Sequence, residues 1–113
     1  MMLVAIRPVV EALASLFDKE YCPIVSHSRN GMDLEARVNV YRPLVFRGFT
    51  IPFLKGKRVA SLSIHSNLVF FGRYHDEASI NWLDSSCSGL YSSRVNDLFQ
   101  QHNVRVTGAS IVR

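Results

Sequence analysis

The chain has 113 residues, of which 48% are hydrophobic and 19% charged, and its formal net charge is +4. A chain of this length normally folds around one core, so a single domain over residues 1–113 is predicted. The composition excludes wholesale disorder and a coiled coil. Cys22 and Cys87 lie far apart in the sequence, which excludes the paired-cysteine spacing of a zinc finger or ribbon.

The apolar run at residues 1–6 is interrupted by Arg7 and Pro8. It therefore ends before it reaches the length of a signal-peptide core or of a membrane-spanning helix. We expect an intracellular, reducing setting with two free thiols and no membrane association.

The first predicted element is a helix over about residues 7–20, because apolar residues recur there at spacings of three and four. Pro8 suits the first turn of a helix, where its missing N–H has no partner to lose. Pro23 prevents continuation because it disfavours the helical conformation of the residue before it.

Residues 24–27 form a short predicted strand, and Asn30-Gly31 suits the tight turn of a hairpin. Apolar and polar residues alternate in the return strand, residues 34–41. This period of two sends alternate side chains to opposite faces, so Arg37 and Tyr41 are predicted to face outward. The side chains predicted to face the core are those of Leu34, Ala36, Val38 and Val40.

Pro43, Gly48 and Pro52 punctuate the next segment, and a proline removes a donor from the hydrogen-bond ladder. Residues 44–54 are therefore predicted to be an edge strand or an irregular connection. Lys55-Gly56-Lys57 is predicted to be a basic turn.

Two further strands are predicted at residues 59–64 and 68–74, joined by a turn at residues 65–67, with Gly72 as a candidate bulge. Residues 80–83 fit either a strand or a helical turn, and the pattern leaves both open.

A second helix is predicted over residues 87–102, again from apolar spacings of three and four. Ser86 or Ser92 is the expected cap at its start, and Asn103 suits its end.

A last strand at residues 104–106 and 109–112, broken at Gly108, completes the predicted order of elements. This order favours an α+β fold with an N-terminal helix, an antiparallel sheet of about four to six strands, a C-terminal helix and a last strand. Two helices cover only one face of such a sheet, so the other face meets solvent, a second copy or a ligand.

Residues 36–75 contain no carboxylate but many cations and rings. Cationic groups neutralise phosphates and rings stack on unpaired bases, so this stretch points to single-stranded nucleic acid. The competing interpretation is ordinary strand composition, in which aromatic residues are common. The residues predicted to bind are Arg37, Tyr41, Arg42, Arg47, Lys55, Lys57, Arg58, Arg73 and Tyr74.

The sequence contains fewer candidate catalytic residues than candidate binding residues. His75-Asp76-Glu77 places an imidazole beside two carboxylates, but neighbours on a strand point to opposite faces, so a site would need a turn or help from His65 or His27. Cys87 lacks the arginine spacing and the glycines of a phosphate-binding cysteine loop, so it is predicted to be a small core residue.

The first predicted function is a small non-enzymatic binding module that contacts a polyanion, with single-stranded nucleic acid preferred. The second is a protein-interaction or assembly subunit: a homo-oligomer, an assembly component or an inhibitor of a larger complex. The third is a hydrolase or nuclease built on His65, His75, Asp76 and Glu77. No cofactor and no metal ion are expected.

Overall fold

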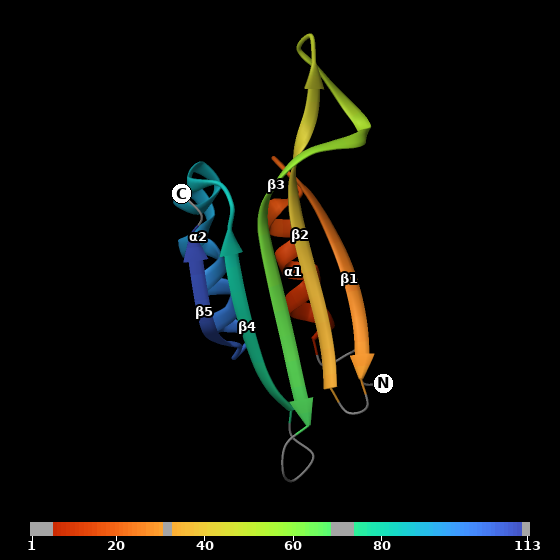
Figure 1. The fold of residues 1–113 in the computed structure, drawn as a ribbon. Helices are drawn as coiled ribbons and strands as arrows, with labels where there is room; N and C mark the ends of the chain where they lie inside the picture. Colours follow the sequence, from red (N-terminus) through yellow and green to blue (C-terminus); the bar gives the residue numbers. More distant parts are fainter. Residues whose placement is uncertain (1–5, 31–32, 69–73, 112–113) are drawn as a thin grey trace.

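The computed structural model describes residues 6–30, 33–68 and 74–111, without the side chains of residues 30, 52–54, 67–68 and 74–75 (Figure 1). It contains the predicted order of helix, strands, helix and last strand, which confirms the α+β fold. The elements are α1 (Arg7–Phe17), β1 (Cys22–Asn30), β2 (Asp33–Phe46), β3 (Phe49–Leu68), β4 (Tyr74–Trp82), α2 (Ser85–Gln101) and β5 (Arg105–Ile111).

The described strands form one sheet in the order β1-β2-β3-β4-β5. The first four pair antiparallel, as the sequence predicted. The last strand differs because β5 runs parallel to β4, so the sheet is mixed. The reason is the connection, since α2 carries the chain back along the sheet before β5 begins and β5 re-enters in the direction of β4.

Both helices lie on one face of the sheet (Figure 1). Buried side chains of the helices and of the strands form one core cluster. The alternation predicted for β2 is confirmed, because the four inward side chains are fully buried and Arg37 is exposed. Rings join the helices to the sheet, since the Phe17 ring stacks on Tyr91 at 4.8 Å between centroids and lies 6.5 Å from Trp82. The opposite face, which we call the open face, carries no helix in the part of the chain that the structure describes.

Two predicted turns are wrong. Residues 55–57 and residues 65–67 both lie inside β3. A Cβ atom at Gly56 would lie 3.2 Å from the Arg42 carbonyl oxygen, so this glycine permits close approach of two strands. Ser66 is fully buried and its hydroxyl donates to Asp76 Oδ1, so its polar side chain is satisfied inside the sheet. The residues that follow, 69–73, lie outside the described part, and Gly72 lies among them.

Other boundaries shift less. α1 ends at Phe17 rather than near residue 20, and β1 is longer than predicted, with Pro23 tolerated because β1 is an edge strand. Residues 80–83, left open by the sequence, belong to β4 up to Trp82. Asn103 has a φ of 57°, which confirms it as the residue that ends α2. None of the helices in the described part of the chain is long and apolar enough to cross a membrane.

Candidate functional site

The most distinctive feature of the fold is a two-stranded arm, which we define as residues 42–58. The pairing of β1 with β2 stops at Tyr41, and the pairing of β4 with β3 stops at Ala60. Beyond these residues β2 and β3 pair only with each other, and they project past the end of the sheet (Figure 1). The predicted edge strand or irregular connection at residues 44–54 is therefore the outer part of this arm.

A tight loop reverses the chain at the tip of the arm. Phe46 pairs with Phe49, and the two residues between them, Arg47 and Gly48, have φ angles of 52° and 81°. Positive φ at both central residues matches the right-handed twist of the flanking strands, which is why such loops close hairpins.

Apolar side chains are exposed at this tip. The exposed fractions are 56% for Val45, 61% for Phe46 and 77% for Phe49. The Arg47 guanidinium lies 5.4 Å from the centre of the Phe46 ring. The tip thus presents two rings and a cation together, an arrangement that offers both stacking and charge.

The arm is irregular below the tip. Pro43 pairs with Lys55 but Leu44 already pairs with Ile51, so β3 carries extra residues, 52–54, that have no counterpart in β2. Proline at the start of this insertion fits a bulge, where a ladder donor is not needed.

The base of the arm carries cations and no acids. Lys57 and Arg58 are exposed and form no ion pair with any residue that the structure describes. Lys55 Nζ lies 4.5 Å from the centre of the partly buried Tyr41 ring. A polyanion that approached here would meet positive charge without competing carboxylates on the arm.

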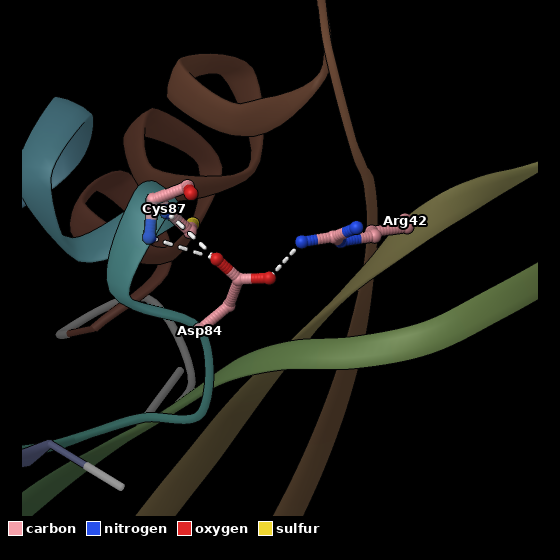
Figure 2. A network of polar contacts seen from close by, with 4 residues as sticks. Arg42, Asp84 and Cys87 are labelled. Atoms are coloured by element: carbon pink, nitrogen blue, oxygen red, sulfur yellow. Dashed lines mark hydrogen bonds and ion pairs between the residues drawn. The ribbon is translucent and has the colours of Figure 1, made fainter. Parts of the chain in front are cut away.

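Arg42 is different, because it is paired. Its guanidinium donates to Asp84 Oδ2, as Figure 2 shows. The other oxygen of Asp84 accepts from the backbone N–H groups of Ser86 and Cys87 at 2.8 and 3.3 Å. Asp84 is therefore the cap of α2, in place of the predicted Ser86 or Ser92, and it also ties α2 to the base of the arm.

The protonation of Asp84 follows from these partners. Burial on its own would raise the pKa of the carboxyl group, but the hydrogen bonds from Arg42, Cys87 and Ser86 outweigh burial and lower the pKa below its usual value. The ionised form is thus the one that the folded state prefers.

We expect Asp84→Ala to lower the free energy of unfolding by about 1 kcal/mol, the usual cost of losing a helix cap. Asp84→Asn keeps a capping oxygen and loses only the charge pair with the half-exposed Arg42, so its loss should be smaller. Urea unfolding at neutral pH measures both variants. Equal losses in the two variants would contradict the assignment of Asp84 as a cap.

The lowered pKa also predicts a pH dependence. The unfolded carboxyl has a pKa of about 3.9, and a group with a lower folded pKa stabilises the fold above that value. This contribution is lost as the pH falls below about 4. The unfolding free energy of the wild type should therefore drop more than that of Asp84→Asn in acid.

Cys87 is confirmed as a core residue, fully buried at the start of α2. Burial raises the pKa of its thiol to about 11 and that of the nearby Tyr21 hydroxyl to about 12. The thiol is therefore protonated at neutral pH, which removes it as a nucleophile.

The open face contains a second candidate functional site, which is less distinctive than the arm. Glu35, His65, Glu77 and Arg105 occupy one row across β2 to β5, and a shallow hollow of about 410 Å³ lies beside this row. Arg37 lies one row away and contacts Glu35 at 3.3 Å, so the charge of this predicted site residue is compensated. Most other open-face side chains are small and polar.

The predicted catalytic cluster is divided between the two faces. Asp76 pairs with the inward Ser66, whereas Glu77 pairs with His65 on the open face. The side chain of His75 lies outside the described part. No group of His, Cys, Asp and Glu among the described residues is arranged to hold a metal ion.

The arm brings together five of the nine predicted site residues. These are Arg42, Arg47, Lys55, Lys57 and Arg58. Tyr41 lies directly below them, and Arg37 is on the open face. Arg73 and the side chain of Tyr74 lie outside the described residues.

Sequence reasoning missed Asp84 as a partner of the arm. The available signal was an aspartate just before a serine-containing helix start, which is a typical cap, but nothing in the sequence links it to Arg42. Comparisons with protein-family models, with curated proteins and with solved structures find no match to this chain. The geometry of the arm therefore carries the functional argument.

Proposed function

We propose that this protein binds nucleic acid, preferably single-stranded, through its β2–β3 arm. The observation that carries the proposal is the coincidence, on one projecting ribbon, of uncompensated cations and exposed rings without any acid. Neutralising phosphates releases condensed counterions, and rings stack on the faces of unpaired bases.

The cations that contribute most are those without a carboxylate partner. Among the residues that the structure describes, no carboxylate pairs with Lys57 or Arg58, and Lys55 and Arg47 contact rings. Arg42 contributes less, because its interaction with Asp84 already offsets its charge. The proposed phosphate contacts therefore lie on β3 at the base of the arm and at the tip.

Single strands are favoured over duplex by the exposed tip rings. Phe46 and Phe49 expose most of their surface, and stacking on a base buries such a ring. A duplex hides its base faces, so stacking there first requires unpairing.

The charge test replaces Lys55, Lys57 and Arg58 together by Gln. Each lost phosphate contact should reduce the slope of log K against log salt by about 0.7 for a single strand, or roughly 2 for all three. The matched control replaces Lys19, Arg94 and Arg105 by Gln, which removes equal charge from outside the arm. Titration of a fluorescent oligonucleotide at several salt concentrations measures the slopes.

The expected result is a flatter slope for the arm variant, an almost unchanged slope for the control variant and unaltered thermal stability for the arm variant. Wild-type protein that shows no salt-sensitive binding in the micromolar range would overturn the proposal. Equal loss in the two variants would show that net charge, and not the arm, governs binding.

The ring test replaces Phe49 by Ala. Stacking is worth about 1 to 3 kcal/mol per base, so affinity for a single strand should fall by roughly 5- to 150-fold while affinity for duplex changes little. Leu90→Ala on α2 is the control, because Leu90 is also exposed, at 59%, but lies away from the arm. Equal losses for single strand and duplex would contradict stacking.

A second candidate function is protein interaction through the same tip. The observation that favours it is the exposure of Phe46 and Phe49, which pair across the tip, and of the neighbouring Val45, since exposed apolar side chains would also fit an apolar cleft of another protein. Such binding would depend on the rings and hardly on salt, so the same two tests separate the candidates.

A further inference from the structure

The two outer edges of the sheet differ in how they are protected. An edge strand exposes unpaired backbone groups, and proteins protect such edges with prolines and charges. β1 has both, since Pro23 has no N–H to donate and the exposed Arg29 lies near its other end. β5 contains no proline, and its one charged residue is Arg105 at its start.

The side chains of β5 that face the helices are apolar and only partly covered. Val106 is in register with Ala78, and Ile111 with Trp82, which are 2% and 3% exposed. Val106 and Ile111 themselves are 36% and 54% exposed. The fully buried core therefore ends at β4, and β5 continues the apolar surface for one more strand that is only partly covered.

β5 keeps a regular register with β4 over most of its length. One irregularity interrupts the register at Thr107, whose hydroxyl donates to the Ala78 carbonyl oxygen at 3.2 Å and holds the bulge against β4. From Gly108 to Ile111 the register with β4 is continuous. These residues present a regular edge to a further strand.

We infer that this edge pairs with β5 of a second copy of the chain, in an antiparallel, two-fold symmetric dimer. The occupant must be an extended strand, because only a strand satisfies a row of backbone donors and acceptors. It must also be apolar toward the helices and small and polar on the open face. β5 itself has this pattern, with Val106 and Ile111 on one side and Gly108 and Ser110 on the other.

Two-fold pairing also explains why the assembly would stop at two copies. A symmetric contact uses the same surface on both partners and leaves no edge of the same kind. Head-to-tail pairing of β5 with β1 would instead continue into a filament, and Pro23 removes a donor from that contact. The dimer joins two sheets into one and places the two arms at opposite ends, so each arm binds on its own.

The experiment is size-exclusion chromatography with light scattering, from micromolar to millimolar protein concentration. The wild type should reach twice the mass of one chain and go no further. Val106→Lys combined with Ile111→Lys should remain at the mass of one chain, because two charges would face each other across the apolar contact. Leu90→Lys, at an exposed apolar residue outside β5, is the control and should dimerise like the wild type.

A wild type that stays monomeric throughout, or forms a series of larger species, would overturn the inference. So would a control that loses the dimer together with the double variant. Amide hydrogen exchange of the wild type gives a second measurement that requires no variant. Within residues 108–111, the alternate amides that point away from β4 should exchange more slowly at high protein concentration, and protection confined to another segment would contradict pairing at β5.

Discussion

Replacing Val38 by Asp is expected to unfold the protein. Val38 lies in the middle of β2, fully buried, with Val25 and Leu62 opposite it on the neighbouring strands. A carboxylate here would have no partner, and an unpaired buried charge costs several kcal/mol against a total stability of roughly 5 to 15 kcal/mol. Circular dichroism during heating measures the result as the loss of a cooperative transition.

The control for this variant is Ser79→Asp, which adds the same charge to the exposed open face of the same sheet. It should melt cooperatively and close to the wild type. A soluble and cooperatively melting Val38→Asp protein would mean that the register of β2 is wrong by one residue, since such a shift exchanges the two faces.

Truncating Phe99 to Ala is the second large effect that we expect. Phe99 is fully buried on α2 and belongs to the same core cluster as Leu13 and Phe17 of α1. Its loss removes apolar contacts and leaves a cavity, which typically costs about 3 to 5 kcal/mol. The measurement is the free energy of unfolding in urea, with Leu90→Ala on the exposed side of α2 as the control.

A loss below about 1 kcal/mol for Phe99→Ala would place α2 at the margin of the core rather than within it. The prediction also bears on the arm. Asp84 caps α2 and pairs with Arg42. A loosely packed α2 would therefore also weaken the contact at the base of the arm. A Phe99→Leu variant, which fills more of the volume, should recover part of the lost stability.

The sequence alone determined the parts of the fold whose signals are local. The period of two in residues 34–41 predicted the buried and exposed faces of β2, because side chains alternate along any strand. Apolar spacing of three and four predicted both helices, and Asn103 marked the end of the second. These features need no knowledge of distant residues.

Polar residues inside β3 misled the sequence interpretation. Lys55-Gly56-Lys57 and His65-Ser66-Asn67 have the composition of turns, yet both continue a strand of 20 residues. Gly56 is there because the backbone of Arg42 approaches closely, and Ser66 is satisfied by Asp76 from the next strand. Both reasons are contacts between strands, which composition does not contain.

The same division applies to the candidate site. The charge imbalance of residues 36–75 is visible in the sequence, and it contains the arm. Only the tertiary structure decided which residues leave the sheet, because that depends on where β1 and β4 stop pairing. Only the tertiary structure brought Asp84 to Arg42, which lies 42 positions away. This contact distinguishes Arg42, whose charge is compensated, from Lys57 and Arg58. The sequence could not show it, because charges pair by distance in space and not along the chain.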